Sequence, residues 1–425
     1  MEAVLAGPAA TSVGVLRRIF AERFARTFAV RLWDGTTIGP DEPVAFTLVV
    51  NAPSALRAAF LPPIDLNPGR AFAAGLIDIE GDIVAAVDTI ARALGALPRL
   101  AIPAIFATLL RLPRPPPIEL PGERKLPGRP HSRERDAAAI GFHYDQPLAF
   151  YRAFLDPEMI YSCAYYRDEA ATLAEAQRAK LDYILDKVRL RAGESLLDIG
   201  CGWGALVIRA AERGAQAVGI TLSRAQYEEA NRRIRERGLD DRARVDFLDY
   251  RDLGSLVYDK IVSVGMFEHV GLANLKRYFR AAYEALRPGG LFLNHGIAEQ
   301  SDGRTGGKVT GFMDRYVFPD GELIAIGDGL AIAERSGFEI RDLENLREHY
   351  AHTARDWVAN LERNRETAIA ATNAATYRIW RLYLAGSSQG FTSGRMALFQ
   401  TLLARPHPDG RIDHLPATRA DLYVR

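Results

Sequence analysis

Cysteine is scarce in this chain: Cys163 and Cys201 are the only two among 425 residues. Two cysteines cannot form a disulfide framework, and they are too few for a structural zinc site. This usage fits a reducing compartment. The N-terminus also lacks the basic flank, apolar core and small-residue cleavage site of a secretory signal peptide. We therefore expect a cytoplasmic protein.

The chain also lacks an excess of one charge and a long unbroken apolar run. Its 54 lysines and arginines nearly balance 53 acidic residues, which gives a formal net charge of +1. This balance provides no general attraction to nucleic acid, so any attraction to a membrane must be local. The most apolar region, residues 94–112, is broken by Pro98, Arg99 and Pro103 and is not expected to span a bilayer. The composition predicts a two-domain globular protein that is not integral to a membrane and does not bind nucleic acid.

The stretch 196–204, Leu-Leu-Asp-Ile-Gly-Cys-Gly-Trp-Gly, is the most informative part of the sequence. An apolar run ends in an acid, and a glycine-rich turn then leads into a helical segment, residues 205–213. Glycines let a ligand approach the backbone closely, and the N-terminus of a helix offers free N–H groups. The G-x-G-x-G spacing lacks the lysine of a triphosphate loop and differs from the G-x-G-x-x-G of dinucleotide-binding folds. Because an acid beside the glycines would repel a pyrophosphate, the stretch favours a cationic amino-acid cofactor such as S-adenosylmethionine.

Residues 1–112 are predicted to form a small α+β domain that binds a partner, because they hold no catalytic constellation. Residues 12–28 have the spacing of an amphipathic helix. Its apolar face consists of Val15, Leu16, Ile19, Phe20, Phe24 and Phe28, and the arginines of the other face are Arg17, Arg18, Arg23 and Arg26. Either the apolar face covers the core of its own domain, or it rests on anionic lipid as an interfacial helix. Short alternating segments between residues 29 and 51 predict a small antiparallel sheet, and helical patterns follow to residue 112.

Residues 113–135 are predicted to be a semi-rigid, extended linker, because seven prolines lie among scattered arginines. Five basic residues of this segment either contact phosphate headgroups or are simply solvated. They are Arg124, Lys125, Arg129, Arg133 and Arg135.

From residue 136 onward, alternating strand-like and helical segments predict an α/β domain with a mostly parallel sheet. The strand-like runs are residues 195–199, 217–220, 245–248, 260–264 and 290–294. Ligands on such sheets bind at the carboxyl ends of the strands. The glycine-rich turn lies at one of these ends, so we expect the cofactor there.

Polar and aromatic residues follow the second and third of these strands. Thr221, with Gln226 one turn into the next helix, stands where a methyltransferase usually carries an acid that holds the ribose hydroxyls. Asp249 either accepts a hydrogen bond from the adenine amine or is an ordinary loop acid. The ring of Tyr250 can lie against the adenine base.

At this point the sequence resembles a known family. Four stretches resemble the class I methyltransferase core: residues 196–204, 221–223 (Thr-Leu-Ser), 265–269 (Gly-Met-Phe-Glu-His) and 286–290 (Leu-Arg-Pro-Gly-Gly). Two more resemble a narrower group, the cyclopropane-fatty-acyl-phospholipid synthase family, which includes the mycolic acid methyltransferases. These are residues 154–157 (Phe-Leu-Asp-Pro) and 161–166 (Tyr-Ser-Cys-Ala-Tyr-Tyr). The resemblance covers residues 140–405 and implies a Rossmann-like catalytic domain.

Two further similarities concern the branch of the family. Residues 1–112 are similar to the lipid-binding N-terminal domain of the members that act on phospholipids, and the mycolic acid enzymes generally lack such a domain. Residues 312–323 and 344–350 look closer to actinobacterial relatives, some of which make methylene- and methyl-branched chains.

The resemblance implies a set of residues that contact S-adenosylmethionine. They are Tyr161, Ser162, the loop 198–204 with Asp198, Gly200, Gly202 and Gly204, and Thr221, Leu222, Gln226 and Tyr250. The chain departs from the family pattern at Ser387, where a cysteine once regarded as catalytic stands in other members. A nucleophilic thiol at that place is therefore excluded.

The resemblance also implies a bicarbonate ion that serves as the base of the reaction. The residues implied to hold it are Cys163, Glu268, His295 and Tyr350, with the backbone near Ile297. These residue types suit an anion, because His295 and Tyr350 donate hydrogen bonds and Glu268 can accept the O–H of the ion and relay its proton.

Each of these residues also has an ordinary structural explanation. Cys163 suits an inert buried thiol, Glu268 a helix cap, and both His295 and Tyr350 suit core positions. His349 and His352 have H-x-x-H spacing without an evident third ligand, so no metal site is expected. Cys201 is expected to pack within the glycine turn.

The implied activity is transfer of a methyl group from S-adenosylmethionine to the double bond of an unsaturated phospholipid acyl chain. The resulting carbocation must lose a proton in a dry pocket, because water would trap it as an alcohol. Loss of a proton from the added methyl gives a cyclopropane ring, which we expect as the family default. A hydride shift before deprotonation gives a 10-methylene chain, which a reductase partner would convert to a methyl branch.

Two functions from other classes remain as alternatives. One is a lipid-binding protein that no longer catalyses, and the other is a small-molecule methyltransferase whose first domain serves only dimerisation. For the leading function we expect a homodimer that is peripheral on the inner face of the plasma membrane.

Overall fold

The computed structural model describes residues 7–24, 26–123, 128–129, 131–144, 146–299, 307–308 and 311–423. The chain divides into two compact units: residues 1–125, 310–317 and 361–389 form the first, and residues 126–309, 318–360 and 390–425 form the second. The sequence predicted a first domain of residues 1–112 and one continuous catalytic domain from residue 136. The structure differs because two later segments pack with the first unit. Arg381, for example, donates to the carbonyl oxygen of Ile79 over 3.1 Å.

The first unit combines helices with a four-stranded sheet of order β2-β1-β3-β4. Its elements are α1 (Gly7–Phe20), η1 (Ala21–Arg23), β1 (Ala29–Leu32), β2 (Thr37–Ile38), β3 (Phe46–Val50), α2 (Ala55–Phe60), α3 (Asn67–Ala73), β4 (Ile77–Gly81), α4 (Ile83–Gly95), η2 (Arg99–Ala101), α5 (Ile102–Leu109), α13 (Gly311–Tyr316), α16 (Arg365–Ala371) and most of α17 (Ala374–Thr392). The predicted antiparallel sheet is wrong at one pair, because β1 and β3 are parallel. The β1–β2 hairpin returns the chain to the edge where β1 began, so β3 starts there and runs in the same direction.

The N-terminal helix α1 ends at Phe20, earlier than the predicted residue 28, and a 3-10 turn follows it. Its apolar face is buried within the first unit, and Val15 and Leu16 are fully covered. Phe28 lies beyond the helix and stacks on Phe46 with a ring-centroid distance of 5.0 Å. The face therefore covers the core of its own domain, so these apolar side chains do not face lipid.

The predicted linker ends earlier than residue 135, because α6 (Arg133–Tyr144) begins at Arg133. The Arg133 guanidinium donates to both carboxylate oxygens of Asp252, over 2.9 and 2.7 Å. Arg135 likewise forms an ion pair with Asp320. Two of the five basic residues thus have carboxylate partners, and Arg124 and Lys125 lie outside the described residues.

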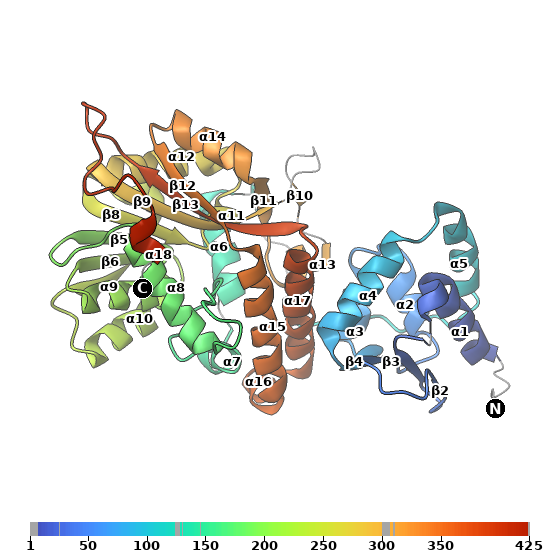
Figure 1. The fold of residues 1–425 in the computed structure, drawn as a ribbon. Coiled ribbons are helices and arrows are strands. Elements are labelled where there is room, and N and C mark those ends of the chain that lie inside the picture. The colour runs from blue at the N-terminus through green and yellow to red at the C-terminus, as the bar shows by residue number, and fades with distance from the viewer. Residues whose placement is uncertain are drawn as a thin grey trace. The chain divides into compact units, whose positions relative to one another are not determined.

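The second unit is an α/β domain around a mixed sheet (Figure 1). Its strands are β5 (Ser195–Ile199), β6 (Gln216–Thr221), β7 (Ala243–Phe247), β8 (Tyr258–Val264), β9 (Leu286–Glu299), β10 (Gly307–Lys308), β11 (Glu322–Ala325), β12 (Glu339–Asn345) and β13 (Met396–Ala404). Its helices are α6, α7 (Leu148–Arg152), α8 (Leu173–Lys187), α9 (Ala205–Glu212), α10 (Arg224–Glu236), η3 (Tyr250–Asp252), α11 (Phe267–Val270), α12 (Leu272–Ala285), α14 (Ile326–Arg335), α18 (Ala420–Tyr423) and most of α15 (Arg347–Arg363).

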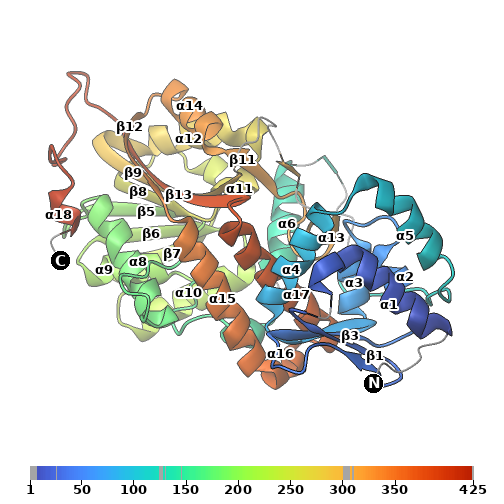
Figure 2. The same cartoon turned by 45° about the vertical axis from the view of Figure 1, so that its right-hand side comes forward.

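All five predicted strands are present, and they form a parallel series in the order β7-β6-β5-β8-β9. Figure 2 shows β5, β6 and β7 side by side. β13 then pairs antiparallel with β9, and β12 pairs antiparallel with β13. Helices cover both faces, which is why β5 is apolar at successive positions: Leu196 packs in one core cluster and Leu197 in the other.

No single helix among the described residues is long and apolar enough to cross a membrane. Helix α4 and the segment Arg99–Leu109 pass that test together, but they are bent by 92° at the break between them. The two pieces therefore form a corner rather than one straight span.

Candidate functional site

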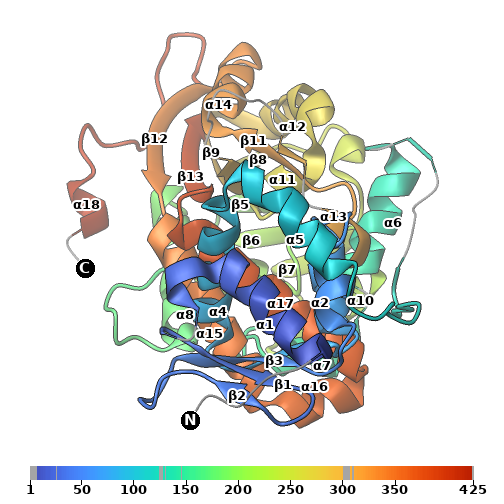
Figure 3. The same cartoon turned by 90° about the vertical axis from the view of Figure 1, so that its right-hand side faces the viewer.

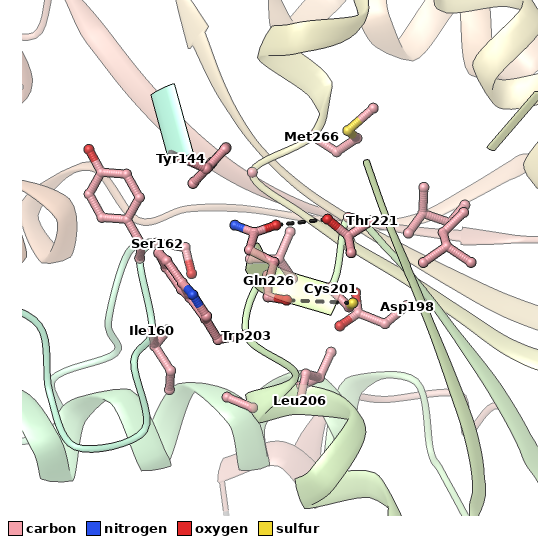
Figure 4. Close-up of a pocket in the computed structure, with 18 of the residues that line it drawn as sticks. Tyr144, Ile160, Ser162, Asp198, Cys201, Trp203, Leu206, Thr221, Gln226 and Met266 are labelled. Carbon is pink, nitrogen blue, oxygen red and sulfur yellow. Dashed lines mark hydrogen bonds between the residues drawn. The ribbon is translucent and has the colours of Figure 1, made fainter. Parts of the chain in front are cut away.

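A hollow with about 970 Å³ of empty volume, partly open to solvent, lies at the carboxyl ends of β5, β6 and β8 (Figure 4). It is lined by nine of the residues predicted to contact the cofactor. They are Tyr161, Ser162, Asp198, Gly200, Gly202, Thr221, Leu222, Gln226 and Tyr250. Gly204 and Asp249 are not among the lining residues.

The glycine-rich turn after β5 serves two purposes. Gly200, Gly202 and Gly204 all have positive φ, at +80°, +54° and +83°, which favours glycine. A Cβ at Gly202 would meet nothing within 4 Å, so this position faces open space. A Cβ at Gly204 would instead lie 3.0 Å from the Cβ of Ala230, so Gly204 permits α9 to pack closely on α10. Gly202 is therefore placed for ligand approach, and Gly204 for packing.

Asp198, the last residue but one of β5, is a buried acid, and its Oδ1 lacks a hydrogen-bond partner among the described residues. Burial raises the pKa of Asp198 to about 7, and the nearby positive charge of Lys180 opposes this shift. A buried acceptor without a partner is stabilised by a bound donor or cation, so Asp198 fits the cationic amino-acid portion of S-adenosylmethionine.

Lys180 is a buried charged residue of the hollow that the sequence did not lead us to predict. Its Nζ donates to Oγ of Ser162 over 2.8 Å. Burial lowers its pKa to about 8, and the nearby carboxylates of Asp156 and Asp198 oppose the shift. Gln177, one turn earlier on α8, donates to the carbonyl oxygen of Ser162 over 2.9 Å. The signal was a pair of polar residues, three apart, on the buried face of α8, which also carries Lys187.

The candidate residues at or after the ends of β6 and β7 line the hollow, except for Asp249. Thr221 donates from its hydroxyl to Oε1 of Gln226 over 2.8 Å, so the two predicted ribose contacts form one hydrogen-bonded pair (Figure 4). Tyr250 is buried in the lining. Asp249 instead accepts from the backbone N–H and from Nε of Arg251, both over 2.8 Å, and caps η3. Its position matches the loop-acid alternative.

The residues implied for bicarbonate converge beside this hollow. Cys163, Ile297 and Tyr350 pack in one buried cluster with Leu346, Phe391 and Leu398. His295 and Ile297 are two residues apart on β9, so their side chains lie on the same face of the sheet. The carboxylate of Glu268 accepts a hydrogen bond from the backbone N–H of Ile297.

Two buried groups in this cluster have no hydrogen-bond partner among the described residues: Oε2 of Glu268 and Nε2 of His295. The other ring nitrogen of His295, Nδ1, lies 3.2 Å from Nε2 of Gln400. In this orientation of the Gln400 amide, whose Oε1 is buried without a partner among the described residues, the amide nitrogen donates to Nδ1 and the imidazole proton is assigned to Nε2. Burial holds the pKa of His295 well below its ordinary range, so the ring is neutral. Gln400, a second missed residue, is a polar residue in the middle of the apolar strand β13.

The structure can be compared with the ordinary structural explanations for Glu268, Cys163 and Tyr350. Glu268 lies within α11 and makes no helix cap. Cys163 is fully buried and donates to the carbonyl oxygen of Ala164 over 3.2 Å. Burial raises its pKa, so Cys163 remains a neutral thiol and not a nucleophile. Tyr350 stacks on Phe391 with a centroid distance of 4.3 Å, and Trp357 lies between Tyr350 and the pocket residue Tyr161.

The remaining sequence candidates lie elsewhere. Ser387 is on α17 within the first unit. Nδ1 of His349 accepts from the backbone N–H of Tyr166, and His352 stacks on the ring of Tyr166. Within the described part of the chain, no three His, Cys, Asp or Glu side chains are grouped to hold a metal. Cys201 is buried and packs in a core cluster, as predicted, although it also lines the hollow.

The two sites can support complementary chemistry. Unpartnered Oε2 of Glu268 requires a donor, and the N–H at Nε2 of His295 requires an acceptor. A small oxyanion that retains one proton satisfies both, which is the chemistry of bicarbonate. The positive charge of Lys180 lowers the pKa of Asp198, of Cys163 and of His295, so Lys180 lies close to both the hollow and the cluster.

Comparison with known proteins gives consistent results. Residues 131–401 match the family described as "Mycolic acid cyclopropane synthetase". The chain is 43% identical to a probable fatty acid methyltransferase of Pseudomonas putida over 93% of this chain and 95% of the relative. It is 34% identical to a probable fatty acid methyltransferase of Mycobacterium tuberculosis over 95% of this chain and 97% of the relative. Among solved structures, mycolic acid cyclopropane synthase CmaA1 complexed with SAH and CTAB matches with a TM-score of 0.57 and 32% identity, covering 63% of this chain and 97% of that one.

Proposed function

The chain belongs to the mycolic acid cyclopropane synthetase family of S-adenosylmethionine-dependent methyltransferases, and we propose that it methylates the double bond of an unsaturated phospholipid acyl chain. The observation that carries this proposal is the buried pair of unpartnered groups, Glu268 Oε2 and His295 Nε2, beside the cofactor hollow. Methyl transfer to an alkene leaves a carbocation that must lose a proton away from water, and a buried acid and imidazole with atoms that lack partners among the described residues suit that step. The names of the two full-length relatives, both probable fatty acid methyltransferases, agree with an acyl substrate.

The residues around the hollow fit S-adenosylmethionine. Asp198 Oδ1 would accept from its amino group, the open space at Gly202 would admit its carboxyl end, and Tyr250 would cover its base. The Thr221–Gln226 pair would hold the ribose. When bound, S-adenosylmethionine supplies an electrophilic methyl group to the alkene, which leaves a positive charge on the acyl chain.

The buried cluster would deal with that charge and its proton. His295 Nε2 and the Tyr350 hydroxyl would donate to a bicarbonate ion, and Glu268 would accept its O–H. Burial raises the pKa of Glu268 to about 7, so this carboxylate can take up and release a proton near neutral pH. The aromatic rings of Tyr161, Trp357 and Tyr350 lie in sequence between the hollow and the cluster, and aromatic faces stabilise nearby cations.

We propose a cyclopropane ring as the product, formed when the proton leaves the added methyl. The second candidate is a 10-methylene chain, which would be completed to a methyl branch by a reductase partner. It is favoured by the relatives' description as fatty acid methyltransferases. Both products require the same base, so the cluster supports each of them.

The deciding experiment uses purified protein, S-adenosylmethionine and vesicles of oleoyl phospholipid, with the released fatty acids analysed by mass spectrometry and NMR. A gain of one CH₂ with cyclopropyl proton signals is the expected result. The same gain with vinylidene protons would replace it by the methylene product. No gain, while the cofactor still binds, would overturn the proposal. We further propose that the enzyme is a cytoplasmic homodimer, peripheral on the inner face of the plasma membrane.

A further inference from the structure

The corner between α4 and α5 in the first unit carries an unusual outward face. Helix α5 packs on α1 and α2 and buries Ile105 and Leu109. Figure 3 shows α5 alongside α1. The opposite side exposes residues at helical spacing: Leu100, Pro103, Ala104, Ala107 and Leu110. None of them is polar, whereas the outward side of a helix on a water-soluble surface normally carries charges.

The leucines at the two ends of this stripe are strongly exposed. Leu100 is 95% exposed and Leu110 is 57% exposed. Ten residues separate them, which is about 15 Å along a helix. Exposing such apolar surface to water is unfavourable, and clustered exposure marks an interaction surface.

The charge next to the stripe is positive. Residues 89–118 contain four arginines and no aspartate or glutamate. Arg92 is paired with Asp88 over 2.8 Å, which leaves Arg99, Arg111 and Arg114. Arg99 directly precedes the exposed Leu100, and Arg111 directly follows the exposed Leu110. Each outward leucine is thus accompanied by a cation, which is the arrangement of a surface that enters the headgroup region of an anionic bilayer.

From these observations we infer that the stripe of residues 100–110, with its flanking arginines, is the surface by which the first unit docks on anionic lipid. The occupant is a bilayer and not a second copy of the chain. In a symmetric dimer the same patch would face itself, so Arg99 and Arg111 of one copy would face arginines of the other without an acid from residues 89–118 to offset them. This inference rests on the proposed function and assigns its membrane contact to α5 instead of to the buried face of α1.

The test measures sedimentation of the full chain with vesicles of mixed anionic and zwitterionic phospholipid. The double variant L100E/L110E should bind at least tenfold more weakly, because two leucines can no longer enter the bilayer. The double variant R99E/R111E should lose both the preference for anionic vesicles and the salt dependence of binding. The matched control is L256E, since Leu256 has the same exposure as Leu110, 57%, but lies in the second unit.

Methyl transfer to oleoyl phospholipid dispersed in detergent separates docking from chemistry. The L100E/L110E variant should retain wild-type activity in detergent and lose activity on vesicles. Equal vesicle binding by the wild type and this variant would overturn the inference, as would a variant that only dissociates a dimer in sedimentation velocity. Failure of the wild type in detergent, with vesicle binding intact, would instead overturn the proposed function and leave the docking surface in place.

Discussion

Gln400 would act on the proposed bicarbonate site only through His295, whose Nδ1 lies 3.2 Å from the Gln400 amide nitrogen. In Gln400→Leu this donor is lost, so the imidazole proton is no longer held on Nε2. We expect kcat to fall at least about tenfold, since general acid–base catalysis contributes about 10²- to 10⁴-fold. The affinity for S-adenosylmethionine, measured by calorimetry, should stay unchanged. A parallel loss of cofactor affinity would show that Gln400 has only a packing role.

Lys180 offers a second test at the level of one side chain. Its Nζ donates to Ser162 and its charge favours ionised Asp198, so Lys180→Met removes both effects. The pKa of Asp198 should rise further, and S-adenosylmethionine should bind more weakly at pH 7 than at pH 8.5, with a larger difference than in the wild type. An unchanged pH dependence of the dissociation constant would contradict this role.

The raised pKa values of Asp198 and Glu268, each about 7, also predict how stability depends on pH. In the unfolded chain these carboxyls release their protons near pH 4. Between about pH 4 and pH 7 the folded state therefore binds more protons, and the free energy of unfolding falls as pH rises, by up to about 1.4 kcal/mol per pH unit for each group. Urea unfolding at several pH values measures this slope. Glu268→Gln should make the dependence of the unfolding free energy on pH shallower. An identical slope in the wild type and this variant would show that the pKa of Glu268 is not raised in the folded state.

The cofactor candidates at the ends of β5, β6 and β7 were within reach of the sequence, because a parallel sheet brings those strand ends together. Tyr161, Ser162 and the candidate bicarbonate residues were predicted only from the family resemblance. Lys180 and Gln400 were not predicted, because each acts through a neighbour that is distant in sequence. Lys180 reaches Ser162 from a helix, and Gln400 reaches His295 across an antiparallel strand pair. Asp249 was predicted from its register alone, which does not reveal that Arg251 occupies its carboxylate.

At the scale of elements, the turn between β5 and α9 contains a matched pair of glycines. Gly202→Ala places a methyl in open space at φ +54°, so it should cost about 1–2 kcal/mol of stability and also weaken S-adenosylmethionine binding. Gly204→Ala adds contact with Ala230 at 3.0 Å to a similar backbone cost, so it should destabilise the fold more. Thermal unfolding should show the larger loss of stability in Gly204→Ala, and cofactor titration should show the larger loss of affinity in Gly202→Ala. The opposite ranking in either measurement would contradict the separate roles of the two glycines.

The strands of the second unit were predictable because both faces of each are buried, which leaves runs of apolar residues such as those in β5. The sheet of the first unit was harder. The direction of β3 depends on the edge of the sheet to which the β1–β2 hairpin returns the chain. The pattern of apolar residues in 29–51 does not reveal that edge. The end of α1 was placed too late because the apolar spacing continues through Phe24 and Phe28 after the helix has stopped.

At the scale of the whole molecule, the first unit depends on Arg381 from α17. This side chain is buried, donates to the carbonyl oxygen of Ile79 and pairs with Glu362. Arg381→Met should lower the free energy of unfolding by about 2 kcal/mol, because a buried carbonyl loses its donor. Arg280→Met, which removes an exposed ion pair on α12, should change it by less than about 0.5 kcal/mol. If chemical denaturation gave equal losses of stability for the two variants, the first unit would not depend on Arg381.

The two-domain organisation was predictable from the change in pattern near the proline-rich segment, but the assignment of residues 310–317 and 361–389 was not. Those segments continue the helical pattern of the catalytic part, and only their tertiary partners place them in the first unit. A linear reading of the chain assigns each residue to the domain of its neighbours in sequence.

The discontinuous first unit has a consequence for synthesis on the ribosome. More than two hundred residues separate its first segment, which ends at residue 125, from its last, which begins at residue 361. At roughly 5–20 residues per second, translation of that interval takes on the order of tens of seconds. Throughout that time the emerged N-terminal segment lacks α16 and α17, and the carbonyl oxygen of Ile79 lacks its donor. The first part of the chain to be made is therefore among the last to complete its fold, and nascent chains should require chaperone protection there.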